Sequence, residues 1–119
     1  MEPTDPRPTV LLAEDDAAVR TVLGRALELA GWRVVQAHDG VDALAVAPAR
    51  IDLVVADLVM PRMGGRELVD RLRRGGRRLP ALLISGYGGT PFGPDERFLA
   101  KPFRPTELAR QAQLLLAGS

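Results

Sequence analysis

The chain has 119 residues, 46% of them hydrophobic, which suits a single domain with one packed core. It has no cysteine, which excludes disulfides and thiolate chemistry, and its formal net charge of +1 gives no general attraction to nucleic acid or anionic lipid. No apolar run approaches the ~20 residues that a membrane span needs, and residues 1–8 are acidic and proline-rich rather than signal-like. We therefore expect a cytoplasmic protein with no membrane insertion and no direct nucleic-acid contact.

The chain opens with a strand followed by a helix. Residues 9–13 are β-branched and aliphatic, which predicts a buried strand that ends in a run of acids. Asp16 is a candidate helix cap, apolar residues recur at helical spacing over residues 17–30, and Gly31 supplies a stop. This pattern predicts the first strand-and-helix unit.

The same unit then repeats. A second strand is expected over residues 33–37, and a brief helix over residues 39–47 before a proline. The third strand, residues 53–56, is fully apolar and leads into Asp57, and a glycine-containing loop precedes a helix expected over residues 66–74.

The last part of the chain contains two further strands. Residues 81–84 predict the fourth strand, and residues 98–100 a short fifth strand. Between them, residues 86–94 include four glycines and two prolines, a composition that disfavours a regular helix. A final helix is expected over residues 105–117, with proline at its first position.

Alternating strands and helices predict right-handed crossovers and a mostly parallel sheet with helices on both faces. We predict a five-stranded, doubly wound α/β domain over residues 9–118, preceded by a tail of residues 1–8. Ligands of such folds bind outside the carboxyl ends of the strands, so those ends are where functional residues are expected.

Polar residues close four of the predicted strands: Glu14 and Asp15 follow the first, Asp57 the third, Ser85 the fourth and Lys101 the fifth. Carboxylates brought together at one edge repel by roughly 4 kcal/mol per pair at ~4 Å. A cation must offset that repulsion, and a set of hard oxygen ligands suits Mg²⁺. The sequence therefore predicts a magnesium site.

Such a set has the parts needed for phosphoryl transfer, which depends on positioning and on neutralisation of charge. Asp57 is then the nucleophile and Asp15 a metal ligand, with Glu14 reaching the ion through water. Lys101 and Ser85 would each bind a phosphoryl oxygen, by charge and by hydrogen bonding.

Four segments together resemble the receiver domain of two-component response regulators over nearly the whole chain. They are LLAEDD (11–16), VVADLVMP (54–61) with Gly64-Gly65, LISG (83–86) and FLAKPF (98–103). The resemblance implies a flavodoxin-like (CheY-like) sheet of order 2-1-3-4-5. It also implies a phosphoryl group received from a sensor histidine kinase or a histidine phosphotransfer protein, with the downstream protein partner left open.

The resemblance implies roles for individual residues around the metal. Asp57 matches the phosphoacceptor, Asp15 the direct metal ligand, and the main-chain carbonyl of Val59 a further ligand. Glu14 stands where the family more often has aspartate, so its longer side chain would contact the metal differently.

Other roles concern switching. Ser85 matches the hydroxyl that moves toward the phosphoryl group, and Phe98 the aromatic side chain that changes rotamer with it. Lys101 matches the phosphate-binding lysine, and the resemblance predicts that its bond to Pro102 is cis.

The segment that follows the fourth strand departs from the usual receiver pattern. Only fifteen residues separate Ser85 from Lys101, so the family's fourth helix must be shortened or missing. Ser85-Gly86-Tyr87 resembles a Ser-Gly-Tyr subgroup of receivers. Our hypothesis is that residues 86–94 become ordered on phosphorylation.

Two alternative functions remain open. An aspartate-nucleophile phosphohydrolase uses similar groups, but normally has a second acid two residues after the nucleophile, where this chain has Val59. A phosphorylation-independent scaffold with the receiver fold is the other alternative. A histidine phosphocarrier is disfavoured because the one histidine, His38, lies at a predicted strand end. We expect a phosphoacceptor rather than a turnover enzyme.

Most of the positive charge is arginine, and lysine occurs once, at Lys101. The arginine-rich stretch from Arg71 to Arg78 is expected to be a solvated helix end, where the helix dipole stabilises cations. The isolated lysine supports a specific role, because its compact charge differs from that of arginine.

Overall fold

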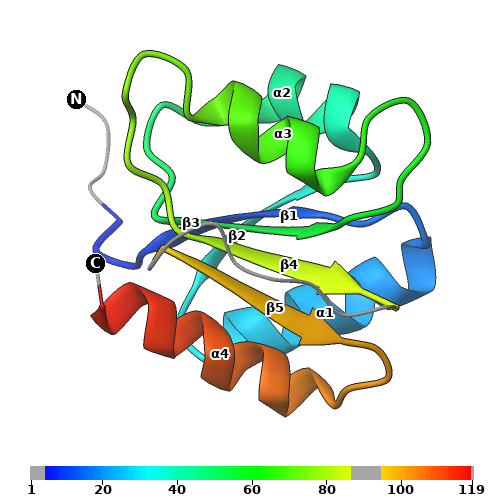
Figure 1. The fold of residues 1–119 in the computed structure, drawn as a ribbon. Helices are drawn as coiled ribbons and strands as arrows, with labels where there is room; N and C mark the ends of the chain where they lie inside the picture. Colours follow the sequence, from blue (N-terminus) through cyan, green and yellow to red (C-terminus); the bar gives the residue numbers. More distant parts are fainter. Residues whose placement is uncertain (1–4, 87–94, 119) are drawn as a thin grey trace.

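The computed structural model describes residues 5–86 and 95–118, in which five parallel strands form one sheet of order β2-β1-β3-β4-β5 (Figure 1). This order confirms the prediction. The elements in chain order are β1 (Thr9–Ala13), α1 (Ala17–Leu29), β2 (Arg33–Ala37), α2 (Gly40–Val46), β3 (Leu53–Asp57), α3 (Gly65–Leu72), β4 (Ala81–Ser85), β5 (Glu96–Ala100) and α4 (Pro105–Ala117).

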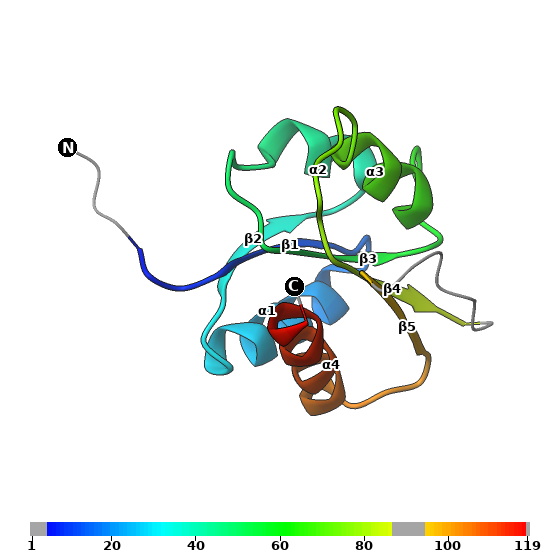
Figure 2. The ribbon, with the colours of Figure 1, turned by 60° about the vertical axis from the view of Figure 1, so that its left-hand side comes forward.

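Helices cover both faces of the sheet, with α2 and α3 on one side and α1 and α4 on the other (Figures 1 and 2). Successive strand residues face opposite layers, so Leu11 and Leu83 pack under α2 and α3, whereas Leu12 and Leu82 pack with α1 and α4. All residues of β1, β3 and β4 are buried. A sheet covered on both faces explains why these strands read as continuous apolar runs.

The helix ends follow local signals. Asp16 accepts hydrogen bonds from the Ala18 and Val19 amides and so caps α1, and Gly31 after the helix has φ 103°. Helix α3 begins one residue before the predicted helix and ends two residues earlier. The chain turns through Gly75 and Gly76, whose φ angles of 87° and 85° suit glycine and end the helix.

Strand β5 begins at Glu96, two residues before its predicted start. The pattern of apolar residues misses this start because Glu96 is a buried charge. The Glu96 carboxylate binds the Arg66 guanidinium through two bonds of 2.7 and 2.9 Å and accepts a 2.7 Å bond from Arg73. Arg73 also donates to the Leu79 carbonyl at 3.0 Å. The expectation that the stretch from Arg71 to Arg78 is a solvated helix end is therefore wrong for Arg73, which is half-buried.

The prediction of a shortened or missing fourth helix, and of a segment that becomes ordered on phosphorylation, concerns residues 86–94, of which 87–94 lie outside the described residues. Within the part of the chain that the structure describes, no helix is both long and apolar enough to cross a membrane.

Candidate functional site

The carboxyl ends of the strands meet at one edge of the sheet. Parallel register places Asp57 of β3 opposite Ile84, and Ser85 of β4 opposite Ala100. Glu14, one residue after β1, has a main-chain amide that donates to the last carbonyl of β2 at 3.1 Å. Glu14, Asp57 and Ser85, all of them buried, therefore lie at this edge of the sheet.

Both oxygens of the Asp57 carboxylate accept hydrogen bonds. Lys101 Nζ donates to Oδ2 at 2.5 Å, and the Val59 amide donates to Oδ1 at 2.9 Å. The main-chain amide of Lys101 donates to the Ser85 carbonyl at 2.9 Å, which fixes the lysine at the end of β5. The Lys101–Pro102 bond is cis, as predicted.

This carboxylate belongs to a cluster of three acids. Glu14, Asp15 and Asp57 each offer an oxygen within 4.8 Å of the others, and Glu14 and Asp57 are buried. Burial, a hydrogen bond with the Asp15 carboxyl and the charge of Asp57 raise the pKa of Glu14 from its ordinary 4.5 to about 7. The cluster therefore holds more negative charge than its surroundings neutralise.

The balance of charge indicates what the cluster can bind. The hydrogen bond with Asp57 raises the pKa of Lys101, so this lysine carries one positive charge against three acids. Carboxylate oxygens with room for water are ligands that fit Mg²⁺, which keeps several waters and takes one or two carboxylates. The residues present therefore fit a divalent hard cation.

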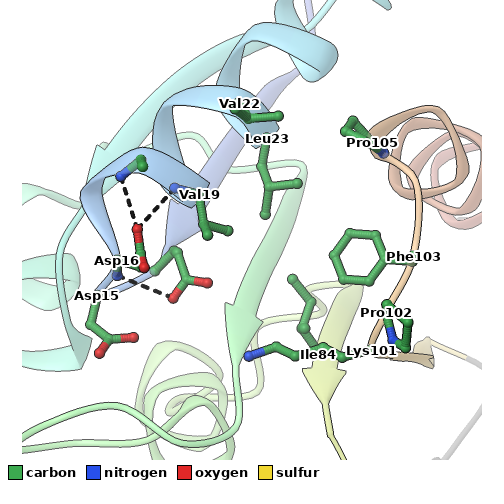
Figure 3. A pocket seen from close by; sticks show the side chains of 12 residues that line it. Asp15, Asp16, Val19, Val22, Leu23, Ile84, Lys101, Pro102, Phe103 and Pro105 are labelled. Atoms are coloured by element: carbon green, nitrogen blue, oxygen red, sulfur yellow. Dashed lines mark hydrogen bonds between the residues drawn. The ribbon is translucent and has the colours of Figure 1, made fainter.

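A cavity of about 690 Å³ opens beside the acids, between α1 and the chain that follows β5 (Figure 3). Asp15 and Asp16 lie on one side of it and Lys101 on the other. Glu14 also lines the cavity, and the rest of its wall is apolar, formed by Ala18, Val19, Val22, Leu23, Ile84, Pro102, Phe103 and Pro105. The cavity is thus suited to a charged group at one end and an apolar surface at the other.

The model of one protein family, the response regulator receiver domain, matches residues 10–113. The chain belongs to this family. Receiver domains are the phosphoacceptors of two-component signal transduction. The acidic cluster around Asp57, at the carboxyl ends of the strands, is consistent with this role.

Curated relatives of this receiver domain are longer than the chain. It is 39% identical over 115 residues to response regulator MprA of Mycobacterium avium (strain 104), covering 90% of this chain and 50% of that protein. The same identity and coverage hold for MprA of Mycobacterium tuberculosis (strain ATCC 25618 / H37Rv). The chain thus spans about half the length of these curated relatives.

Solved receiver structures have the same fold. The receiver domain from hybrid histidine kinase CckA is 34% identical, with a TM-score of 0.77 and coverage of 91% of this chain and 98% of that one. Chemotaxis response regulator CheY4 of Vibrio cholerae is 30% identical, with a TM-score of 0.77 and coverage of 92% and 98%. Response regulator protein TrrA from Thermotoga maritima, in complex with Mg(2+)-BeF, shares the fold at 24% identity, with a TM-score of 0.76 and coverage of 91% and 98%.

The receiver domain brings most of the predicted site residues together. Asp57, Glu14, Asp15 and Lys101 are within one cluster, and Ser85 lies at its edge through the main-chain bond to Lys101. The second predicted switch residue, Phe98, lies outside this cluster. Phe98 is half-buried on β5, opposite Leu83, and packs against the core under α2 and α3.

Two features of the receiver domain were not found from sequence. One is the apolar wall of the cavity, because Val19 and Val22 read as ordinary core positions of a helix. The other is a hydrogen-bonded ion pair between Asp39 and Arg62, which are 23 residues apart. From sequence, Asp39 is expected only at the start of a helix. The structure buries this residue, and a buried carboxylate needs a partner in addition to the helix amide that it caps.

Proposed function

We propose that Asp57 accepts a phosphoryl group from a phosphohistidine and that the modified domain binds its partners differently. The observation that carries this proposal is a buried carboxylate that is hydrogen-bonded to the one lysine and lies within 4.8 Å of two further acids. We also propose that Mg²⁺ is held by Asp15, Asp57, the Val59 main-chain carbonyl and, through water, Glu14. TrrA, whose structure contains Mg(2+)-BeF, shares this fold.

The transfer moves a phosphoryl group from the imidazole of the donor to the Asp57 carboxylate. A carboxylate oxygen of Asp57 attacks the phosphorus as the bond to the donor's imidazole nitrogen breaks, and that nitrogen keeps the bonding electron pair. When bound, Mg²⁺ supplies neutralisation of charge on the phosphoryl oxygens. Lys101, bonded to Asp57 in the unmodified protein, turns to a phosphoryl oxygen, and the Ser85 hydroxyl donates to another.

Switching follows from the same contacts. Ser85 is buried at the end of β4, so its movement toward a new phosphoryl oxygen changes the space beside β5. Phe98 lies on β5 and is half-buried, and we propose that its ring changes rotamer as Ser85 moves. We propose that these two residues transmit the modification to a protein partner.

The surface next to the site supports a protein phosphodonor. Val22 and Pro105 line both the cavity at the acids and a second hollow of about 470 Å³ between α1 and α4. Val22 is 53% and Leu29 75% exposed, so apolar surface lies beside a charged site. We propose a cytoplasmic sensor histidine kinase or histidine phosphotransfer protein as donor, with no direct binding to nucleic acid or membrane.

Two finer assignments rest on the sequence. We propose that residues 9–118 are the receiver domain and residues 1–8 a tail, since the strand pattern begins at Thr9. We also propose that the chain belongs to the Ser-Gly-Tyr subgroup with a shortened or missing fourth helix, because Ser85-Gly86-Tyr87 is followed by a glycine- and proline-rich segment.

Phosphorylation is tested by intact-protein mass after incubation with a small acyl phosphate, with and without Mg²⁺. We expect the wild type to gain one phosphoryl group only with Mg²⁺, and Asp57→Asn to gain none, because an amide is a poor nucleophile. An equal gain in both proteins would place the phosphoryl group elsewhere. No gain in either would favour the scaffold, and sustained turnover of a phosphate ester would favour a phosphohydrolase.

The raised pKa of Glu14 predicts how stability and metal binding depend on pH. Because the folded protein binds a proton more tightly than the unfolded chain, the metal-free protein should lose stability between about pH 4.5 and pH 7 as the pH rises. Above pH 7, Mg²⁺ should restore stability, and its binding should weaken as pH falls below 7.

Glu14→Gln should remove this part of the pH dependence and stabilise the metal-free protein at pH 8 by roughly 1–3 kcal/mol. Urea titrations from pH 5 to 8, with and without Mg²⁺, test both effects, and an unchanged pH profile in the variant would contradict them.

A further inference from the structure

The loop between β3 and α3, residues 58–64, contains the Val59 carbonyl that we assign to the metal. Its first amide, that of Leu58, donates to the Ile84 carbonyl at 2.9 Å, so the start of the loop is fixed to β4. The rest of the loop leaves the sheet and lies beside the start of α2, whose neighbour on the same face is α3 (Figure 1). What holds that part in place therefore bears on the geometry of the site.

An ion pair joins the loop to α2. Arg62 donates from Nε at 2.9 Å and from Nη2 at 2.7 Å, both to Oδ2 of Asp39. The other oxygen of Asp39 accepts from the Asp42 amide at 2.8 Å and so caps α2. The Asp39 side chain is 5% exposed, whereas that of Arg62 is 56% exposed. The buried carboxylate thus has a separate partner for each oxygen.

The backbone at Arg62 requires such a restraint. Its φ is 68°, and Arg62 is the only non-glycine residue with positive φ among residues 5–86 and 95–118. The Met63 amide donates to the Pro61 carbonyl at 2.7 Å, which closes a three-residue turn around Arg62. A turn of this hand is strained for a residue with a side chain and persists only when its surroundings hold it.

Close packing removes the remaining freedom of the loop. A Cβ atom added to Gly40 would lie 2.7 Å from the Met63 carbonyl oxygen, and one added to Gly64 would lie 2.3 Å from the Leu58 carbonyl oxygen. The loop therefore touches the first turn of α2 on one side and its own beginning on the other. A shift at Arg62 must be passed along the chain toward Val59.

We propose that Asp39 and Arg62 are a positioning pair that holds residues 58–64, and with them the Val59 carbonyl and amide, in the arrangement required by Mg²⁺ and by Asp57. Asp39 is not part of the acidic cluster of Glu14, Asp15 and Asp57, so we assign the pair no direct contact with the ion. The inference rests on the proposed function, because it assumes that Val59 is a metal ligand. Its direct support is the hydrogen bond of 2.9 Å from the Val59 amide to Asp57 Oδ1. Val59 lies three residues before Arg62 in the same loop.

The test compares variants of this pair with a matched ion pair elsewhere. Arg62→Met removes the positive charge of the pair. Asp39→Asn removes the negative charge but keeps a side-chain oxygen that can cap α2. Arg62→Gly accepts the positive φ but has no side chain. Arg110→Met is the control, since the Arg110 side chain is 59% exposed and its partner Glu107 lies on the same helix, α4.

Mg²⁺ affinity is measured by titration calorimetry on the unphosphorylated chain. We expect Arg62→Met, Arg62→Gly and Asp39→Asn to raise the Kd for Mg²⁺ about tenfold, as outer-shell changes at metal sites commonly do, and Arg110→Met to leave it unchanged. In metal-free samples, the ¹⁵N–¹H signal of Val59 should shift in the three pair variants and stay in place in the control. The second readout does not depend on metal or on phosphorylation.

The outcomes separate this inference from the proposed function. A Kd within twofold of wild type in the pair variants, or an unmoved Val59 signal, would overturn the positioning role and leave the proposed function intact. A wild type that binds no Mg²⁺ would overturn the proposed metal site itself. A glycine variant that binds Mg²⁺ like the wild type would show that Arg62 serves only to form the turn, which also overturns the pair.

Discussion

Replacing Glu96 with alanine is expected to lower the free energy of unfolding by about 3–5 kcal/mol, the usual cost of leaving a buried charge without its partner. The Glu96 side chain is 2% exposed and binds the half-buried guanidinium groups of Arg66 and Arg73, both at 2.7 Å. The hydrogen bond with Glu96 raises the pKa of Arg66. A guanidinium keeps its charge in proteins even without such a pair, so the positive charge stays when Glu96 is removed. Urea denaturation followed by far-ultraviolet circular dichroism measures the change.

A matched variant lies on the outer surface of α3. Glu67 pairs with Arg71 at 2.7 Å, but its side chain is 54% exposed, so Glu67→Ala should cost less than about 1 kcal/mol. Glu96→Gln, which keeps the volume and loses the charge, should fall between the two alanine variants. Equal losses for Glu67→Ala and Glu96→Ala would refute the assignment of a buried, stabilising ion cluster.

The position of this cluster gives it a second consequence. Arg66 lies in the first turn of α3, directly after the loop that carries Val59, and Glu96 begins the strand that ends next to Lys101. The cluster therefore ties together two elements that each supply a group to the site. Its loss should displace both elements, so Glu96→Ala is also expected to weaken Mg²⁺ binding, whereas Glu67→Ala should not.

The site could be predicted from sequence because it is formed by the ends of strands. Asp57, Ser85 and Lys101 each follow a short apolar run, and parallel strands place their carboxyl ends at the same edge. Neither the distances nor the side-chain contacts were needed to bring these residues together. The alternation of strands with helices was enough to fix the edge on which they lie.

The ion pairs could not be predicted, because they join helices and loops whose relative positions depend on packing. Arg62 and Asp39 are 23 residues apart, and Arg66 and Glu96 are 30 residues apart. A charge inside a strand also hides that strand from a pattern of apolar residues, which is why β5 was predicted to start at Phe98. Two features of the sequence together would have pointed to Glu96. It is an acid placed just before an apolar strand, and the chain has an arginine-rich helix that can supply its partners.

Lys101→Met is expected to separate two steps that the wild type performs together. The rate of phosphorylation by a small acyl phosphate should fall about 10²–10³-fold, the usual loss when one group that stabilises transition-state charge is removed. Mg²⁺ affinity should stay the same or increase, because the ammonium group bonded to Asp57 Oδ2 competes with a cation for that oxygen. Mass spectrometry over time and titration calorimetry on the same samples give the two quantities.

The opposite direction of the two effects makes this variant informative. If Lys101 served mainly to hold the Asp57 carboxylate in place, its loss would let the carboxylate rotate, and Mg²⁺ affinity would fall together with the rate. Lys101→Arg tests the same point, since it keeps the positive charge but replaces a compact ammonium with a planar guanidinium. A rate restored by arginine would show that charge alone is sufficient, whereas a rate as low as that of Lys101→Met would show that the ammonium must reach a phosphoryl oxygen that a guanidinium at this position cannot.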